Sequence, residues 1–90
     1  MPKAIHVLAF ANMQILDVTG PLQVFASAND LARQRGMSVP YAPSVIASGG
    51  GAVMSSAGLA LVAEPLPGQG SDTLIIAGGW GVYAAAEDEA

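Results

Sequence analysis

Two short stretches of the sequence hold the residues most able to take part in chemistry. Asp17 lies in the apolar run 15–22 (ILDVTGPL), and Gly78 and Gly79 begin the stretch GGWG. A carboxylate among apolar neighbours has to be paired or hydrogen-bonded. Glycines after a buried strand let backbone N–H groups face a ligand or a developing negative charge. The candidate ligand-binding residues are therefore Asp17, Gly78, Gly79 and Trp80, and Asp17 is also the candidate acid if the protein is an enzyme.

Each candidate also has a structural interpretation that stays open. Asp17 suits a residue that ties down a loop, the glycines suit a tight turn between a strand and a helix, and Trp80 suits packing in a core or an interface. The stretch 79–84 (GWGVYA) fits the dinucleotide pattern G-x-G-x-x-A, but it follows a late strand rather than the first one, so the match is weak. His6 interrupts an apolar strand, where we expect a histidine bonded to backbone rather than a ligand-binding one.

The elements that must position these residues follow the pattern of an α/β domain. The first apolar run predicts a strand buried on both faces. Gly20-Pro21 predicts a helix start and Gly36 a helix end, whereas Pro40 and Pro43 predict that their strand lies at a sheet edge or carries a bulge. The predicted elements are a strand at 4–11, a loop at 12–20, a helix at 21–34, a second strand at 37–48, a hairpin from 52–55 and 59–63, a strand at 72–77 and the start of a helix at 82–86.

This order of elements indicates a mostly parallel sheet with helices as connections. In such sheets, ligands and reacting groups gather beyond the carboxyl ends of the strands. Asp17 follows the first strand and the two glycines follow the last one. We therefore expect Asp17 to lie near the Gly78–Gly79 backbone.

The composition excludes several kinds of site within these residues. The net charge is −4 with only three Lys and Arg residues, so there is no basic surface for DNA or RNA. The absence of cysteine excludes disulfides, thiolate metal sites and a cysteine nucleophile, and no cluster has metal-ligand spacing, so we expect neither metal nor cofactor. The start does not resemble a signal peptide and no run has membrane-spanning length, which predicts a cytoplasmic protein without a membrane partner.

The balance of apolar and charged residues bears on partners. Ninety residues allow one small domain at most. The apolar share is 52% and the charged share 11%, whereas ordinary domains carry about 25% charged residues. Exposed apolar surface usually marks an interface. We therefore expect a homodimer partner or a complementary chain segment to cover part of this chain.

Four runs taken together resemble a known family. They are AIHVLAFA (4–11), LDVTGPLQVFASAND (16–30), SSAGLALVAE (55–64) and DTLIIAGGWG (72–81). In this order they are similar to the PfpI/ThiJ-like domain of the class I glutamine-amidotransferase-like superfamily, and most similar to the N-terminal sensor domain of AraC-family transcriptional regulators. The resemblance implies a flavodoxin-like, mostly parallel sheet flanked by helices, with residues 1–90 as the N-terminal portion of the domain.

The resemblance implies a ligand-sensing, non-catalytic domain that binds a small-molecule effector, an amine- or amide-like metabolite, and helps the regulator to dimerise. DNA would be bound only through a C-terminal helix-turn-helix region, which is absent from this chain. The alternative is a cysteine-dependent enzyme of the isonitrile hydratase type, truncated before its nucleophile. Asp17 would then match the acid beside the cysteine, and Gly78 and Gly79 the oxyanion pocket. Ala77 departs from the family, where proline is common, and without cysteine this chain is not expected to be an enzyme by itself.

Overall fold

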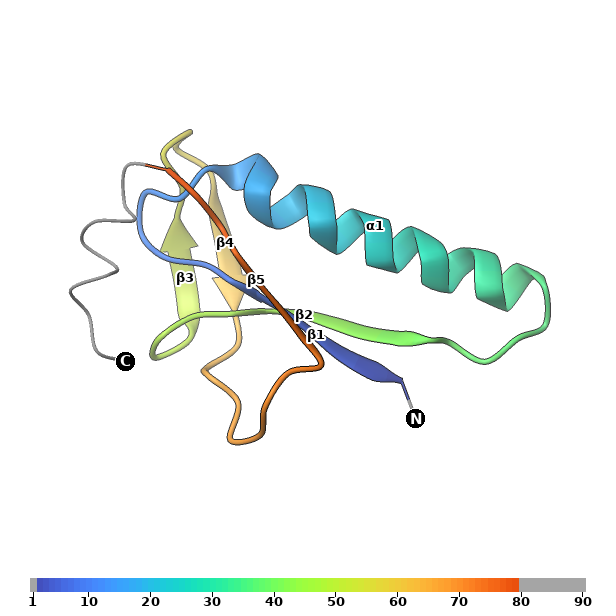
Figure 1. Cartoon of the computed structure of the whole chain (residues 1–90). Helices are drawn as coiled ribbons and strands as arrows, with labels where there is room; N and C mark the ends of the chain where they lie inside the picture. The colour runs from blue at the N-terminus through green and yellow to red at the C-terminus, as the bar shows by residue number, and fades with distance from the viewer. Residues whose placement is uncertain (1, 80–90) are drawn as a thin grey trace.

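The computed structural model of the chain describes residues 2–79, which form a helix and two small sheets (Figure 1). In chain order the elements are β1 (Lys3–Leu8), α1 (Ile15–Gln34), β2 (Tyr41–Ile46), β3 (Gly51–Met54), β4 (Ala60–Ala63) and β5 (Thr73–Ile76). β1 is the central strand of a three-stranded sheet of order β2-β1-β5 and runs parallel to both neighbours. The predicted α/β architecture with a parallel sheet is confirmed. The predicted start of a helix at 82–86 lies outside the described residues.

The helix α1 begins at Ile15, so the predicted loop over 12–20 and the predicted helix start at Pro21 are wrong. The run 18–20 (VTG) contains weak helix formers, and Pro21 has no N–H to donate to the carbonyl of Asp17 one turn earlier. These local preferences favour a loop. Contacts with the rest of the fold outweigh these local preferences. Asp17 therefore belongs to the first turn of the helix rather than to a loop.

Packing and side-chain bonds hold the first turns of α1 in place. Val18 is fully buried in the core cluster together with Val7, Met13 and Ala77. The hydroxyl of Thr19 donates a hydrogen bond of 3.0 Å to a backbone carbonyl at the start of the helix. Burying a side chain such as Val18 contributes roughly 1.5–3 kcal/mol. Since Gly and Thr lower helix stability by at most about 1 kcal/mol each, burial of this kind can offset their low propensity.

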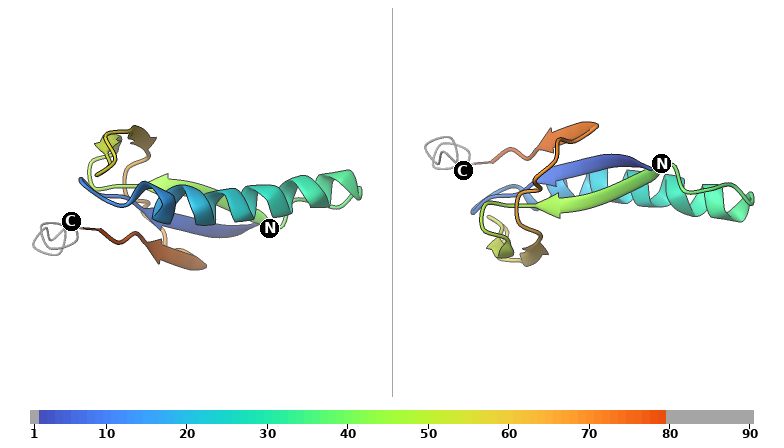
Figure 2. Two further views of the ribbon diagram at one scale, coloured as in Figure 1. Left: turned by 90° about the horizontal axis from the view of Figure 1, so that it is seen from above. Right: turned by 90° about the horizontal axis from the view of Figure 1, so that it is seen from below.

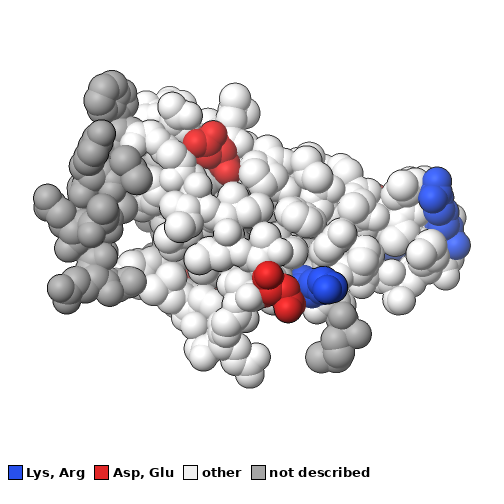
Figure 3. Space-filling model, in the orientation of Figure 1, with Lys and Arg blue, Asp and Glu red and all other residues white. Residues whose placement is uncertain are grey.

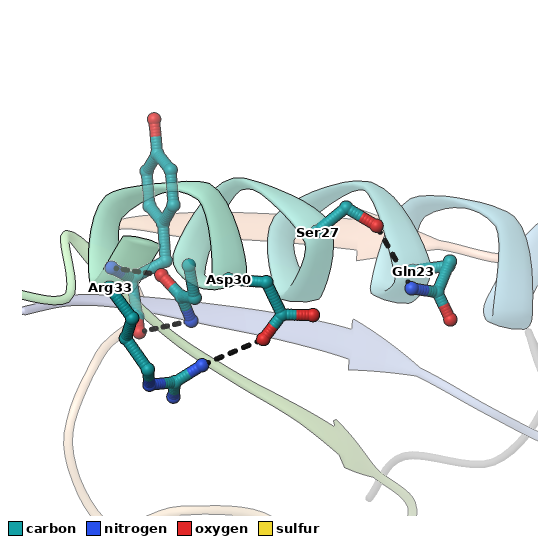
Figure 4. Close-up of polar contacts among 6 residues, drawn as sticks. Gln23, Ser27, Asp30 and Arg33 are labelled. Atoms are coloured by element: carbon teal, nitrogen blue, oxygen red, sulfur yellow. Dashed lines mark hydrogen bonds and ion pairs between the residues drawn. The ribbon is translucent and has the colours of Figure 1, made fainter. Parts of the chain in front are cut away.

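The predicted end of the helix is confirmed. α1 ends at Gln34, and Gly36 adopts φ +69°, the left-handed conformation that glycine tolerates best. The N–H of Met37 then donates to the carbonyl of Ala32 at 2.9 Å, which closes the helix end. On the solvent side, Gln23–Ser27 and Asp30–Arg33 side chains are bonded within the helix (Figure 4). Within residues 2–79, no helix combines the length and the apolar character needed to cross a membrane.

One face of the three-stranded sheet packs against α1. Val7 of β1 lies level with Val45 of β2 and Ile75 of β5, so these side chains share one face. They contact the core cluster that includes Val18 of the helix. Figure 2 shows α1 lying across this side of the sheet.

The opposite face of the sheet has no covering helix among residues 2–79, as the view from below in Figure 2 shows. His6 and Leu8 are half-buried there, and their neighbours on β5, Leu74 and Ile76, are 51% and 61% exposed. The prediction that the first strand is buried on both faces therefore does not hold within the described residues. Parallel sheets are usually covered on both faces, so this face is incomplete in the part of the chain described.

The outer edge of β2 is occupied by the chain's own groups. The buried Asn29 side chain donates to the carbonyl of Tyr41 at 3.0 Å and accepts from its N–H at 3.2 Å, as a neighbouring strand would. Pro43, the next residue facing outward, has no N–H to offer. Further along the same edge, the N–H of Glu64 donates a hydrogen bond of 2.9 Å to the carbonyl of Val45. Of the two alternatives predicted for this strand, an edge position or a bulge, the edge position is confirmed within the described sheet.

The predicted hairpin is formed by β3 and β4, which pair in an antiparallel register. Its turn is organised by the buried Ser55, whose hydroxyl accepts the N–H groups of Ala57 and Leu59 at 3.3 Å each. An isolated bridge joins Ser55 to Met13, just ahead of α1. The hairpin is thereby fixed beside the loop that leads from β1 into the helix.

Candidate functional site

The carboxyl ends of β1 and β5 lie side by side in the sheet. After β1 the chain passes through α1 to β2 on one side, whereas β5 lies on the other side of β1. The connections therefore change direction between β1 and β5, which is where open α/β sheets bind ligands. Figure 1 shows the start of α1 next to the end of β5 at this position.

Asp17 and Gly78 are in direct contact at this position. The Gly78 N–H donates a hydrogen bond of 2.9 Å to Oδ2 of Asp17, and both residues are half-buried. A Cβ on Gly78 would lie 3.0 Å from the same oxygen, so a larger residue would push the carboxylate away. The predicted proximity of Asp17 to the glycines is confirmed by this bond. Ligand binding by these residues stays a prediction.

The backbone of the loop before α1 also contacts the two glycines. The N–H of Gln14 donates to the carbonyl of Gly78 at 2.9 Å. Gly79 has φ +120°, and a Cβ there would lie 2.9 Å from the Gln14 nitrogen and 3.1 Å from the Asn12 carbonyl oxygen. Only glycine fits such a conformation and such a close approach. The two glycines thus let the end of β5 lie directly against the start of α1.

This geometry changes what the glycine backbone can do. The Gly78 N–H, predicted as an oxyanion donor by the family resemblance, is already bonded to Asp17. A carboxylate in that place disfavours a second negative charge. Within residues 2–79 the Asp17 carboxylate makes no other hydrogen bond, so its Oδ1 can accept an N–H from a ligand. The arrangement as described suits a donor such as an amine or an amide better than an anion.

Among residues 2–79, no cation neutralises Asp17. The three basic residues are Lys3, Arg33 and Arg35, and the ion pair found among the described residues joins Arg33 to Asp30 at 2.8 Å. On the face shown in Figure 3, basic surface lies at the far end of α1 and close to the N-terminus. The negative charge at the start of the helix is instead favoured by the N-terminal end of the helix dipole.

His6 lies away from this site. It sits on the incompletely covered face of the sheet, and its Nδ1 is hydrogen-bonded to the hydroxyl of Ser71. The expectation of a backbone partner is therefore wrong, since the partner is a side chain. Ser71 precedes β5, so this contact belongs to the amino end of that strand rather than to the carboxyl end. Trp80 lies outside the described residues, as does most of the stretch 79–84.

Two features of this region have no clear signal in the sequence. Gln14 contributes through its backbone N–H, and backbone contacts leave no pattern of residue types. A cavity beside β3 is lined mostly by small apolar residues, which read as ordinary strand and loop residues. Within residues 2–79 no three His, Asp or Glu side chains gather as a metal site requires.

No protein-family model matches the sequence. A protein of Streptomyces lividans, named "Uncharacterized protein in cpoL 5'region", is 32% identical over 80 residues, which are 87% of this chain and 52% of that protein. The crystal structure of an AraC family transcriptional regulator from Pseudomonas putida has a similar fold, with a TM-score of 0.66 and 20% sequence identity over 87% of this chain and 48% of the other. The present chain thus spans about half the length of its curated relative and of its structural neighbour. The α/β fold described above is shared with part of a solved AraC family regulator.

Proposed function

We propose that this chain is the N-terminal portion of a PfpI/ThiJ-like, flavodoxin-like domain that senses a small molecule for an AraC-type transcriptional regulator. The likeness in fold to such a regulator, over 87% of this chain, supports the proposal. Because the chain matches about half of that protein, we assign DNA binding to the part of the regulator that this chain does not match. The effector occupies the site of Asp17, Gly78, Gly79 and Trp80. A homodimer partner or a complementary chain segment covers the exposed apolar surface.

The hydrogen bond between the Gly78 N–H and the Asp17 carboxylate is the observation on which this function rests. It lies between the carboxyl ends of β1 and β5, where α/β sheets hold ligands. The bond fixes Oδ2 and leaves Oδ1 of Asp17 without a partner in residues 2–79. An amine- or amide-like effector supplies the N–H donor that this oxygen lacks.

The test compares three small probes of the same shape, namely acetamidinium, acetamide and acetate. Thermal unfolding of the 90-residue chain is followed with each probe at rising concentration, because a ligand of the folded state raises the melting temperature. We expect the largest shift with acetamidinium, a smaller one with acetamide and none with acetate. A shift with acetate alone, or with none of the three, would contradict the proposed site.

Asp17→Asn is the informative variant, since its amide oxygen still accepts the Gly78 N–H while the negative charge is lost. We expect this variant to fold and to lose the response to acetamidinium. Asp72→Asn is the matched control. Asp72 also accepts a backbone N–H, that of Ala4 at 2.7 Å, but it lies at the amino end of the sheet. The control should keep the full response.

The alternative drawn from the sequence, a cysteine-dependent enzyme of the isonitrile hydratase type, gains no support. The Gly78 N–H that an oxyanion pocket would use is bonded to Asp17 instead. We therefore do not propose a catalytic function for it.

A further inference from the structure

The outer side of α1 carries a row of exposed apolar side chains. Leu16, Val24 and Leu31 are 76%, 65% and 47% exposed. Gly20 and Ser27 lie between them and are exposed as well. Because an α-helix turns by about 100° per residue, all five residues fall within a sector of about 80° on one side of the helix. These five residues are called the outer stripe below.

The outer stripe lies on the far side of α1 from the sheet (Figure 1). The buried residues Val18 and Ala32 are on the opposite side of the helix, which packs against β1 and β2. A domain of this class is built from helices on the faces of a sheet, so α1 already belongs to an outermost layer. Whereas the bare face of the sheet calls for a layer of the same domain, whatever covers the outer stripe comes from another molecule.

The order of side-chain sizes along the outer stripe suits a twofold axis. Val24 stands in the middle, the small residues Gly20 and Ser27 follow on either side, and Leu16 and Leu31 stand at the two ends. In a twofold interface both copies use the same patch, so each contact occurs twice. An antiparallel pair of α1 helices centred near Val24 sets Leu16 of one copy against Leu31 of the other, and Gly20 against Ser27. The small residues leave room for the usual distance of about 8–10 Å between helix axes.

The charges of α1 also favour an antiparallel pair. Asp17 stands in the first turn, and no further charged residue follows until Asp30. The last turn carries Arg33, and Arg35 follows as the C-cap, so this end has a net positive charge. An antiparallel pair places each acidic end beside a basic end and each helix dipole against its opposite, whereas a parallel pair would bring like charges together. Asp17 lies outside the outer stripe and keeps its bond to Gly78.

We propose that the outer stripe is the contact surface for a second copy of this chain, whose α1 packs against it in antiparallel orientation about a twofold axis. The inference rests on the proposed function in one respect, the homodimer, and it uses none of the effector-site residues. A contact along one helix of about 30 Å buries less than the roughly 1,200 Å² typical of stable interfaces. The dimer is therefore weak and depends on concentration.

The test captures the pair through single cysteines, because the chain has none of its own. Gln23→Cys lies at the middle of the outer side of α1, and Gln34→Cys is the matched change at the end of the same side; both glutamines are exposed. In the antiparallel pair the two copies of position 23 are about 10 Å apart and those of position 34 about 30 Å apart. A short bismaleimide should therefore link Gln23→Cys into dimers at least tenfold more than Gln34→Cys, as measured on denaturing gels at rising protein concentration.

Two further changes, each made in the Gln23→Cys chain, locate the contact. Val24→Glu places a charge at the centre of the outer stripe and should lower the cross-linked fraction at least fivefold. Val62→Glu is the same change on the hairpin, at a position that is 81% exposed, and should alter the fraction less than twofold. If Val24→Glu fails to fold, the comparison of the two cysteine positions still decides the result.

Three outcomes would overturn the proposal. They are the absence of cross-linking in Gln23→Cys, equal cross-linking in Gln23→Cys and Gln34→Cys, and equal losses with Val24→Glu and Val62→Glu. Association through the β5 edge alone would give the first of these outcomes. None of them affects the effector site, because the response to acetamidinium depends on Asp17. Loss of that response with cross-linking intact would instead contradict the proposed effector site alone.

Discussion

At the β2 edge of the sheet the backbone is covered by the chain's own groups, whereas at the β5 edge no residue among 2–79 pairs with the strand. On the β2 edge, the Asn29 side chain is hydrogen-bonded to the N–H and to the carbonyl of Tyr41, and Pro43 has no N–H to offer. These are the devices by which natural sheets prevent a further strand from adding. The β5 edge has none of them among the described residues, and next to it Leu74 and Ile76 remain largely exposed.

This difference teaches where the sheet can be extended. A protected edge terminates a sheet, and an unprotected edge beside exposed apolar side chains meets either more of the same chain or a partner. The Asp17–Gly78 pair lies on the β5 side of β1. The candidate effector site is therefore beside the same unprotected edge, at the start of α1, whereas the exposed Leu74 and Ile76 lie on the face of the sheet that α1 does not cover.

The largest effect is expected from Gly79→Ala, which breaks the β5 side. An alanine there would have to adopt an unfavourable φ of +120°, and its Cβ would lie 2.9 Å from the Gln14 nitrogen. Strain and crowding together should lower the free energy of unfolding by roughly 4 kcal/mol, measured by urea denaturation. Gly20→Ala, in the helix with nothing within 4 Å of its Cβ, is the control and should raise it by about 1 kcal/mol. Equal effects of the two changes would refute the close contact at Gly79.

Asn29→Leu tests the β2 side, with a somewhat smaller effect. Leucine has nearly the same shape but leaves the N–H and the carbonyl of Tyr41 without partners, and each unpaired group costs about 1–3 kcal/mol. We expect a loss of about 3 kcal/mol in urea denaturation and new self-association through the uncovered edge. The control is Gln23→Leu, because Gln23 forms an exposed bond to Ser27 on the same helix. A loss below 1 kcal/mol for Asn29→Leu would show that the edge needs no such protection.

The smallest change in stability is expected from Leu74→Lys together with Ile76→Lys. Both side chains are more than half exposed, so the free energy of unfolding should change by less than about 0.5 kcal/mol. Charged residues at an exposed edge oppose association. Sedimentation velocity should therefore show less dimer than for the unmodified chain. Val62→Lys, at a hairpin position that is 81% exposed, is the control and should leave association unaltered. If Val62→Lys lowers the dimer fraction and the double variant does not, the interface is on the hairpin instead.

Local signals in the sequence predict the elements that local chemistry determines. The helix end at Gln34 follows from Gly36, whose left-handed conformation closes the last turn. The edge position of β2 follows from Pro43, which cannot donate to a neighbouring strand. The hairpin and the parallel arrangement follow from the spacing of short apolar runs.

The features that the sequence does not reveal depend on contacts between distant residues. Weak helix formers hide the true start of α1 at Ile15, because the burial of Val18 and not its propensity holds it there. For the same reason the sequence indicates that Asp17 lies near Gly78 but not that it accepts the Gly78 N–H, which requires Asp17 to stand in the first helical turn. The partner of His6, Ser71, is 65 positions away and has no local signal.

The central claim is that the Asp17 carboxylate binds the Gly78 N–H and thereby defines the effector site between β1 and β5. Hydrogen exchange of the Gly78 amide, followed by NMR in the unmodified chain, Asp17→Asn and Asp17→Ala, measures that bond directly. We expect slow exchange in the first two and exchange at least tenfold faster in Asp17→Ala, while the Val7 amide in the central strand stays unchanged. Equal exchange rates at Gly78 in all three proteins would contradict the claim.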